Sequence, residues 1–454
     1  MHIFPQLRKL ERKYASELVV VGVHSAKFPT EKETDSLTAA VRRCELEHPV
    51  INDAEFRVWQ QYSCRAWPTL MFIDPRGNVI GKHEGELTFE QFDTLMAGMV
   101  AEFDEAGIMQ RSPLPTTPPP GPQNDLSFPG KVLADEAGRR LFIADTNHNR
   151  IIVSSFDGEV QQVIGDGEET LADGPLAQSA FNHPQGMAID GDILYVADTE
   201  NHAIRRVDLQ AGQVETIAGT GEQGYDRTGG SPGRSTSLSS PWDVVLHNGV
   251  LYIAMAGIHQ LWSLDLQTGI VGPYAGSGRE AITDGPLATA ALAQPSGITT
   301  DGERLYFADS ETSAIRNADL PSFNSPPQGG SNGGAVRTLI GLGLFEFGDV
   351  DGDDFRVRMQ HPIGITSHDG VLYVADTYNH KIKRVLPKTR SAFTVAGTGS
   401  PGHADGPFAQ ARFSEPSGLS IANGTMYIAD TNNHAIRVAN METSEVATLE
   451  LTGL

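Results

Sequence analysis

The sequence has few of the residues that several protein classes require. Its 454 residues include only two cysteines, Cys44 and Cys64, too few for a disulfide framework. No stretch approaches the roughly 18 consecutive apolar residues of a membrane-spanning helix. Residues 1–15 lack the apolar core and the small-residue cleavage site of a signal peptide. We therefore expect a cytoplasmic protein with reduced thiols and no membrane association.

Basic residues are also scarce. Lysine and arginine number 34 against 57 aspartates and glutamates, which gives a formal charge of −23 at pH 7. Nucleic-acid binding needs clustered cations that neutralise phosphates, so we expect no nucleic-acid partner. Glycine (48) and proline (27) are abundant instead. This composition favours many turns over long helices.

The first 110 residues alternate helix and strand patterns. Residues 4–14 and 88–107 have the apolar spacing of amphipathic helices, and a third helix is predicted within residues 30–48. Residues 17–25 form a β-branched run that is typical of a buried parallel strand. Residues 68–85 are predicted to form a hairpin around an Asp-Pro-Arg-Gly turn. The pattern predicts an α/β domain over residues 1–110.

A proline-rich segment follows this domain. Residues 111–124, RSPLPTTPPPGPQN, contain six prolines. Such a composition favours extended polyproline II and predicts a semi-rigid linker between two domains.

From residue 125 to 454 the sequence repeats about every 50 residues. The aligned positions are Asp145, Asp198, Met255, Asp309, Asp376 and Asp430. Each unit holds a strand led by Pro-x-Gly, a strand that ends at the aligned position, and two further strands. Four short strands per period predict a propeller blade, so six units predict an all-β, six-bladed propeller. The longest spacing is explained by a Gly/Pro/Ser insertion at 321–337.

The repeated turn motif predicts a structural role, because a catalytic group is needed once per site and not four times around a ring. Aspartate side chains accept hydrogen bonds from nearby backbone N–H groups, and the histidine can bridge to the neighbouring blade. We assign this role to Asp145, His148, Asp198, His202, Asp309, Asp376, His380, Asp430 and His434.

Two further expectations come from comparing the units. Blade three (AMAGIHQL) and blade four (ADSETSAI) have lost motif residues, so we expect them to have the least regular hairpins and to be the first place to look for a binding sector. Each unit owns all four of its strands. We therefore expect no clasp strand, and a ring that closes by side-chain packing or by residues outside this chain.

The units resemble NHL repeats through the triplets NHN, NHA and NHK. The resemblance covers about 330 residues. It implies a propeller scaffold that binds a protein or peptide partner and needs no cofactor. Basic members of the family bind RNA, but residues 111–454 hold 22 basic and 40 acidic residues, so this branch is disfavoured.

A metal site needs separate consideration. His183 and His361 precede proline at the start of strands in blades two and five, and Glu415 has the same position in blade six. Some NHL-like propellers that act as amidating lyases hold a channel zinc through such histidines, which makes these three residues the candidate ligands. His-Pro-x-Gly is also an ordinary entry turn, and we expect no metal. The acidic run 348–355 has its glycine at the wrong position for a calcium loop and aligns with the interblade loops.

Residues 62–86 resemble the second half of a thioredoxin-like domain. The hallmark is Trp67-Pro68-Thr69, where that family has a cis-proline loop that binds extended peptide. The whole layout is similar to the family of NHL repeat-containing protein 2. The resemblance implies a central strand and a Cys-x-x-Cys motif before the first helix, and neither is present. We interpret Cys44 and Cys64 as structural fillers, and we infer either a true start upstream of Met1 or a remnant stabilised by the propeller.

Three functional hypotheses follow. The favoured one is an interaction scaffold without its redox cysteines, which is not an enzyme as the chain stands. The alternative is a thiol–disulfide oxidoreductase, if the true N-terminus carries Cys-x-x-Cys. A channel-metal lyase would require His183, His361 and Glu415 to converge.

Overall fold

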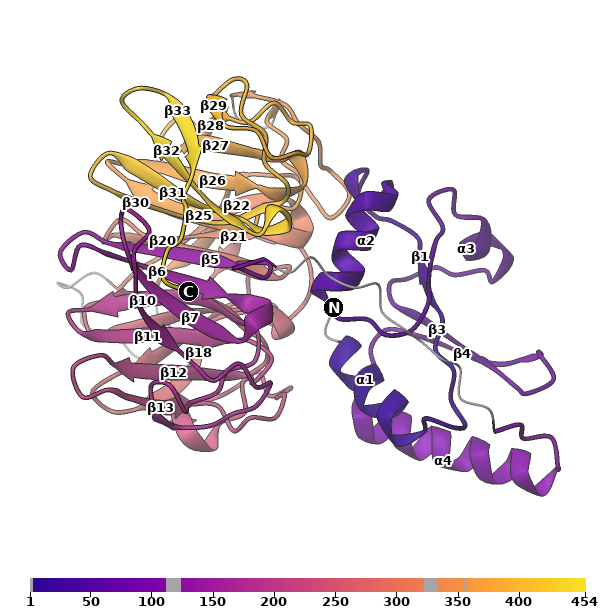
Figure 1. Ribbon diagram of the computed structural model, residues 1–454. Coiled ribbons are helices and arrows are strands. Elements are labelled where there is room, and N and C mark those ends of the chain that lie inside the picture. The colour runs from indigo at the N-terminus through magenta and orange to yellow at the C-terminus, as the bar shows by residue number, and fades with distance from the viewer. Residues whose placement is uncertain (1–2, 112–123, 322–332, 354–355) are drawn as a thin grey trace. The chain divides into compact units, whose positions relative to one another are not determined.

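The computed structural model describes residues 3–111, 124–321, 333–353 and 356–454, and the chain divides into two compact units, residues 1–123 and 124–454 (Figure 1). Most of the proline-rich linker predicted at 111–124, and most of the insertion predicted at 321–337, lie outside the described residues.

Over residues 3–111, the first unit is an α/β structure with four α-helices and two separate two-stranded sheets. β1 pairs with β2 in parallel, and β3 pairs with β4 antiparallel. Helices α1 and α4 bury Leu10, Phe92 and Met96 against each other. The elements are α1 (Phe4–Lys13), β1 (Gly22–His24), η1 (Thr30–Lys32), α2 (Thr34–Arg43), β2 (Val50–Asn52), α3 (Arg57–Gln61), β3 (Thr69–Ile73), β4 (Val79–Glu84) and α4 (Phe89–Glu105).

The run at 17–25 differs from its prediction as a buried strand. Only Gly22–His24 pair with a neighbour, and Val19, Val21 and Val23 are 50%, 50% and 41% exposed. Within the described residues, β1 has a partner on one side only, so its other edge and alternate side chains of the run stay uncovered. The prediction of a buried strand was wrong for this reason.

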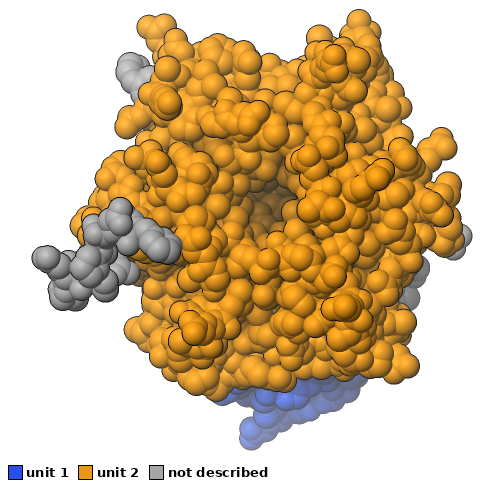
Figure 2. Space-filling view, turned by 90° about the vertical axis from the view of Figure 1, so that its left-hand side faces the viewer, with its two compact units in different colours: residues 1–123 blue, residues 124–454 orange. Residues whose placement is uncertain are grey.

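The second unit is the predicted six-bladed β-propeller. Its six inner strands contact one another in a closed ring, and Figure 2 shows the centre of this ring hollowed. These inner strands are β5 (Lys131–Asp135), β10 (Pro184–Asp190), β15 (Pro241–His247), β20 (Pro295–Thr300), β25 (Gly364–His368) and β30 (Pro416–Ala422), and they define blades one to six.

Three further strands follow each inner strand outward in antiparallel order. The second strands are β6 (Arg140–Asp145), β11 (Ile193–Asp198), β16 (Val250–Met255), β21 (Arg304–Asp309), β26 (Val371–Asp376) and β31 (Thr425–Asp430). The third strands are β7 (Arg150–Ser155), β12 (Ala203–Asp208), β17 (Gln260–Asp265), β22 (Ala314–Asp319), β27 (Lys381–Leu386) and β32 (Ala435–Asn440). The fourth strands are β8 (Val160–Ile164), β13 (Gln213–Ala218), β18 (Ile270–Ala275), β23 (Ala335–Ile340), β28 (Ser391–Ala396) and β33 (Glu445–Thr448).

Blades two to six carry a fifth, two-residue strand on the outside. The chain places it there before it enters the inner strand of the same blade. These strands are β9 (Gly174–Pro175), β14 (Ser231–Pro232), β19 (Gly285–Pro286), β24 (Gly352–Asp353) and β29 (Gly406–Pro407). β24 falls in the acidic run at 348–355, so this run aligns with the interblade loops.

Beside the four strands of blade one, the other end of the chain adds a bridge of a single residue. Thr452 bridges Glu159, its N–H donates to the Gly158 carbonyl at 3.0 Å, and its carbonyl accepts from the Val160 N–H at 2.9 Å. All four strands of blade one, β5 to β8, come from its own unit as expected, and the described residues contain no clasp strand. The Thr452 bridge was not predicted, because one residue is too short a segment to show a strand pattern.

The core of the propeller is divided among the seams between blades. Six buried apolar clusters each combine side chains from two neighbouring blades. The cluster at the seam of blades six and one, for example, joins Leu141 and Ile152 to Tyr427 and Ile436. Because every blade packs on two neighbours, the ring has no terminal blade.

Candidate functional site in the repeat turns

The repeated aspartate is fully buried at the end of the second strand, and its oxygens are engaged by other groups. In blade two, Asp198 Oδ1 accepts from the Asn182 N–H at 2.7 Å. Its Oδ2 accepts from Asn201 Nδ2 at 2.9 Å and from Arg205 at 2.7 Å. Asp198 and Arg205 are both 0% exposed. A carboxylate held in this way organises the turn and is closed to any substrate.

The same arrangement recurs in other blades. Each motif aspartate accepts a backbone N–H from the residue that leads into its inner strand, at 2.6–2.7 Å; the donors are Ser127, Asn182, Ala293, Gln360 and Ser414. Arg316 and Arg437 bind Asp309 and Asp430 as Arg205 binds Asp198. The basic residue seven positions after the aspartate was missed at the sequence level, although its fixed spacing is visible there.

A short turn, which is a 3-10 helix in blade one and in blades three to six, follows the aspartate position, and the residue after the turn has a left-handed backbone with φ between 48° and 55°. These turns are η2 (Thr146–His148), residues 199–201 in blade two, η4 (Ala256–Ile258), η5 (Ser310–Thr312), η7 (Thr377–Asn379) and η8 (Thr431–Asn433). The left-handed residues are Asn149, His202, His259, Ser313, His380 and His434.

Each left-handed residue accepts a backbone N–H from the next blade. We call these contacts the seam bonds. His202 Nδ1 accepts from Ser240 at 3.1 Å and His380 Nδ1 accepts from Glu415 at 3.1 Å. The other four join Asn149 to His183, His259 to Gln294, Ser313 to His361 and His434 to Phe128, at 2.9–3.2 Å. The seam bonds therefore form a complete ring around the propeller.

Blade one carries the motif one residue out of register. His148 lies three residues after Asp145, which is the position of Asn201 in blade two, and its Nδ1 lies 2.8 Å from Asp145 Oδ2. Asn149 makes the seam bond in this blade. At the sequence level, His148 is grouped with His202, His380 and His434 because all four belong to an Asn-His triplet. In the structure, Asn149 and not His148 has the position and the seam bond of these histidines.

Blades three and four keep regular hairpins, contrary to expectation. His259 and Ser313 have the same left-handed φ, 55° and 51°, as the residues in the other blades. In blade three Met255 replaces the aspartate and Trp262, also fully buried, replaces the arginine. The prediction was wrong because a seam needs an acceptor on a left-handed residue, and serine supplies one as histidine does.

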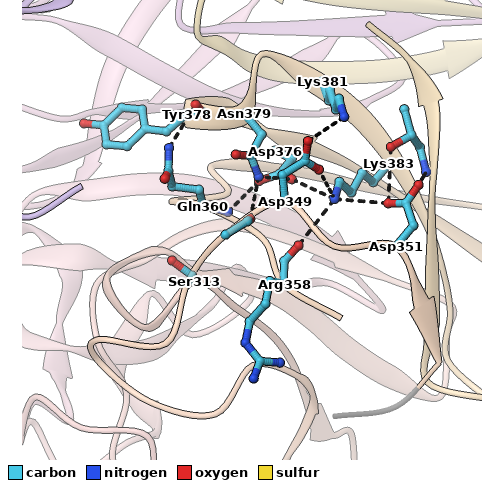
Figure 3. Close-up of polar contacts among 12 residues, drawn as sticks. Ser313, Asp349, Asp351, Arg358, Gln360, Asp376, Tyr378, Asn379, Lys381 and Lys383 are labelled. Atoms are coloured by element: carbon cyan, nitrogen blue, oxygen red, sulfur yellow. Dashed lines mark hydrogen bonds and ion pairs between the residues drawn. The ribbon is translucent and has the colours of Figure 1, made fainter. Parts of the chain in front are cut away.

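Blade five has an altered version of the aspartate–arginine pair (Figure 3). Lys383 replaces the arginine, is 0% exposed, and lies 2.8 Å from Asp349, 3.2 Å from Asp351 and 3.4 Å from Asp376. Burial lowers the pKa of Lys383, but the surrounding carboxylates outweigh burial and hold its pKa above the ordinary value. Lys381 also binds Asp349. The two lysines thus pair with Asp349 and Asp351 of the acidic run.

Burial raises the pKa of four motif aspartates. It raises the pKa of Asp376 and of Asp430 to about 6, against the opposing effect of Lys383 and Arg437. The pKa values of Asp198 and Asp309 are raised for the same reason.

The three candidate metal ligands do not form a metal site. His183 and His361 are buried left-handed residues before proline, and their backbone N–H groups serve the seam bonds. Their side chains lie 3.8 Å from Glu200 and 3.7 Å from Glu311, respectively. Across residues 3–111, 124–321, 333–353 and 356–454, no group of three or more His, Cys, Asp or Glu side chains is placed to hold a metal ion.

In the first unit, Trp67-Pro68-Thr69 forms a loop that opens strand β3. The Trp67–Pro68 peptide is cis, and Trp67 is 47% exposed. Trp67 Nε1 donates to the Ser25 carbonyl at 2.8 Å, and the Trp67 ring packs on Trp59 at 4.5 Å between centroids. The loop therefore presents an aromatic surface.

Neither cysteine is in a disulfide, and both are partly exposed. Cys44 caps the end of α2 and does not lie within the helix, because Glu45 takes a left-handed φ of 50° and ends it.

The NHL repeat family model matches residues 181–206 and 413–439, which contain the aspartates, turns and seam residues of blades two and six. The chain belongs to the NHL-repeat proteins. It is 42% identical to "NHL repeat-containing protein 2" of Gallus gallus, over 99% of this chain and 66% of the relative. The corresponding values for the Homo sapiens protein of that name are 40%, 99% and 66%.

A plant relative is equally similar. "Protein SUPPRESSOR OF QUENCHING 1, chloroplastic" of Arabidopsis thaliana is 42% identical over 100% of this chain and 44% of its own length. The chain thus spans less than two thirds of the length of these relatives, 66% of the two NHL repeat-containing proteins and 44% of the plant protein. In the part of the chain that the structure describes, no helix is long and apolar enough to cross a membrane.

Proposed function

We propose that the NHL propeller is an interaction scaffold that binds a protein or peptide partner. One observation carries this proposal: the polar side chains of the repeats are committed to the turns and seams. The motif aspartates are 0% exposed, as are their basic partners Arg205, Arg316, Lys383 and Arg437, and the left-handed histidines accept seam bonds. The ring is thereby a rigid support, and the loops at its two faces are the part open to a partner.

The two faces can be tested separately. The 3-10 turns and the loops after the fourth strands lie at one end of the blades, and the hairpins between third and fourth strands lie at the other. Glu280 and Gln267 are exposed representatives of these two ends in blade three. We expect a photo-crosslinking residue at position 280 or at position 267 of the full chain to give discrete protein adducts in cells.

The comparison between positions provides the control. Adducts that form from one face and not from the other identify the binding face. A chain that gives no adduct from either position, and from equivalent positions in the other blades, contradicts the scaffold proposal.

We further propose that the Trp67-Pro68-Thr69 loop contacts extended peptide. The half-exposed Trp67 ring, packed on Trp59 beside the start of β3, supports this role. Binding of the full chain to an array of extended peptides should weaken with Trp67→Ala. It should be unchanged with Tyr225→Ala, which removes an aromatic ring of similar exposure, 49%, from the propeller. Equal binding by both variants would refute this role.

A further inference from the structure

The inner strands approach one another most closely at the third residue of their Pro-x-Gly starts. In four blades this residue is glycine, at 186, 297, 364 and 418. A Cβ atom on Gly297 would lie 2.2 Å from the Ile363 carbonyl oxygen, and one on Gly364 would lie 2.5 Å from that of Ser417. A side chain here has no room toward the next strand, so the ring favours glycine at this level.

Blades one and three break this pattern with opposite charges. Lys131 follows Pro129-Gly130, and Asp243 follows Pro241-Trp242, so both occupy the glycine position. Their side chains are only 7% and 11% exposed. Two oppositely charged residues have replaced glycine at the same level of the ring, in blades that are not neighbours.

The two side chains meet across the strand between them. Lys131 Nζ donates to Asp243 Oδ2 at 2.9 Å and approaches the Ser296 carbonyl of blade four at 3.4 Å. Asp243 Oδ2 also accepts from the Ile298 N–H of blade four at 3.2 Å. Inner strand β10 of blade two separates β5 from β15 in the ring. The ion pair therefore spans blade two and joins blade one to blades three and four.

We propose that Lys131 and Asp243 form a bolt that closes the central channel at the level of the glycines and ties blade one to blades three and four. The bolt leaves the outer faces and loops as the surfaces open to a partner. The bolt concerns how the ring is closed. This proposal therefore does not depend on the proposed scaffold function, and each can fail without the other.

The test is a double-mutant cycle on the full chain with Lys131→Met, Asp243→Asn and their combination. Each single change leaves a buried polar or charged group without its partner, and we expect it to lower the folding equilibrium constant by about 100-fold or more. The combined variant should lose much less than the product of the two single effects. The exposed pair Arg206–Glu215 provides the matched control, with little change for Arg206→Met or Glu215→Gln.

Hydrogen exchange measures the connection between the blades. Under native conditions, where exchange reports local opening, Asp243→Asn should speed exchange in β5, which is 112 residues away in sequence and not adjacent to β15, and should leave β27 of blade five as in the wild type. The variant Lys131→Gly/Asp243→Gly reproduces the other four blades, so it should fold, and it should expose the Ile298 N–H to faster exchange through the opened channel.

The outcomes separate clearly. The bolt is supported if the single variants fail to fold while the double-glycine variant folds. It is also supported by a strong coupling between Lys131 and Asp243 in the double-mutant cycle. Additive single effects, unchanged exchange in β5, or a double-glycine variant no more stable than the single variants would overturn it.

Discussion

At each seam the residue after the turn has to accept a hydrogen bond while its backbone keeps a positive φ. Histidine does so in four blades, asparagine in one and serine in one. An Nδ1 atom that accepts an N–H has no proton of its own, so the seam selects neutral histidine with the proton on Nε2. Burial also lowers the pKa of His259 and His380.

This requirement predicts a pH effect. A histidine whose pKa is lower in the folded state contributes stability above its unfolded value near 6.5, and that contribution is lost as the pH falls below it. The variant His259→Asn/His380→Asn should keep the seam bonds as Asn149 does. We expect its stability relative to the wild type to increase steadily from pH 7.5 to pH 5, measured by urea unfolding at each pH.

The difference between the two proteins is the informative quantity. Asp376 and Asp430, whose pKa values are raised to about 6, favour the folded state as the pH falls, and this opposite trend is common to both proteins. His247→Asn, in a hairpin outside the seams, serves as control. If the difference in unfolding free energy between variant and wild type does not change with pH, protonation of the seam histidines does not affect the stability of the fold.

The buried and exposed arginines of β12 allow a second prediction. Arg205 is fully buried and binds Asp198, whereas its neighbour Arg206 binds Asp208 and Glu215 at the surface. Arg205→Met leaves Asp198 without its cation and should cost about 3–5 kcal/mol of unfolding free energy. Arg206→Met should cost less than about 1 kcal/mol in the same denaturant titration. Equal effects would contradict a special role for the buried pair.

At this scale the sequence predicted the aspartates well and the acceptors poorly. Asp198 and its equivalents recur as one letter in five of the six blades, because a carboxylate there both accepts the entry N–H and binds the cation. The seam acceptor varies among three residue types, and in blade one the familiar His148 is not the acceptor. Lys131 was missed because no repeat pattern marks a residue that departs from glycine once.

Strand length limited what could be foreseen of the elements. Blades two to six take a two-residue outer strand from the chain that precedes them, and blade one takes Thr452. Strands of one or two residues have no alternation to detect. The resemblance of the first unit to thioredoxin-like domains stays a prediction, because its two sheets are separate within the described residues, and the oxidoreductase hypothesis stays with it.

The Thr452 bridge to blade one can be tested through its backbone. Thr452→Pro removes the N–H that donates to Gly158, whereas Thr452→Ala keeps it. We expect Thr452→Pro to cost about 1 kcal/mol and to speed exchange of the Val160 amide. Thr452→Ala should resemble the wild type in both measurements. Slow exchange at Val160 in the proline variant would mean that the bridge does not hold blade one.

Helix α3 depends on a single carboxylate. Asp53, 5% exposed, accepts from the Val58 and Trp59 N–H groups at 3.0 and 2.9 Å and from Ser25 Oγ at 2.8 Å. Burial raises the pKa of Asp53, but these hydrogen bonds outweigh burial and leave it lowered. Its stabilising contribution is therefore present above pH 4 and lost as the pH falls below that value.

Asp53→Ala should thus release α3 and the Trp59–Trp67 contact. We expect a loss of about 1–2 kcal/mol and a weaker near-ultraviolet circular dichroism signal from the tryptophans. Asp74→Ala, in the exposed turn between β3 and β4, is the control. An unchanged tryptophan signal in Asp53→Ala would show that α3 is held by packing alone.

For the whole propeller, closure predicts shared stability. Every blade has two neighbours and a core at each seam, so a defect in one blade should lower the stability of all six. Arg205→Met in blade two should accelerate hydrogen exchange of β27 in blade five as well as of β12, when exchange is measured under mildly denaturing conditions. Acceleration confined to blade two would indicate that the blades open one at a time.

The fold of the propeller was predictable as a whole because its period, strand patterns and turn residues agree over six copies. A single departure, such as Met255 with Trp262, did not disturb the count. The first unit offers one copy of each signal, and there the run at 17–25 was misjudged, because burial depends on partners that the local pattern does not record.

The seam bonds also bear on how such repeats diverge. Each seam requires only a hydrogen-bond acceptor in the side chain of a left-handed residue. Histidine, asparagine and serine all supply one within this chain. Mutation can therefore exchange these residues with little loss of stability. The sequences of the copies then diverge while the fold of the blades stays the same. The family model matches two of the six copies, in blades two and six. In distant relatives, the number of blades should therefore be counted from the position of the hydrogen-bond acceptor and the positive φ. A count from residue identity alone would miss blades, as the family model does here.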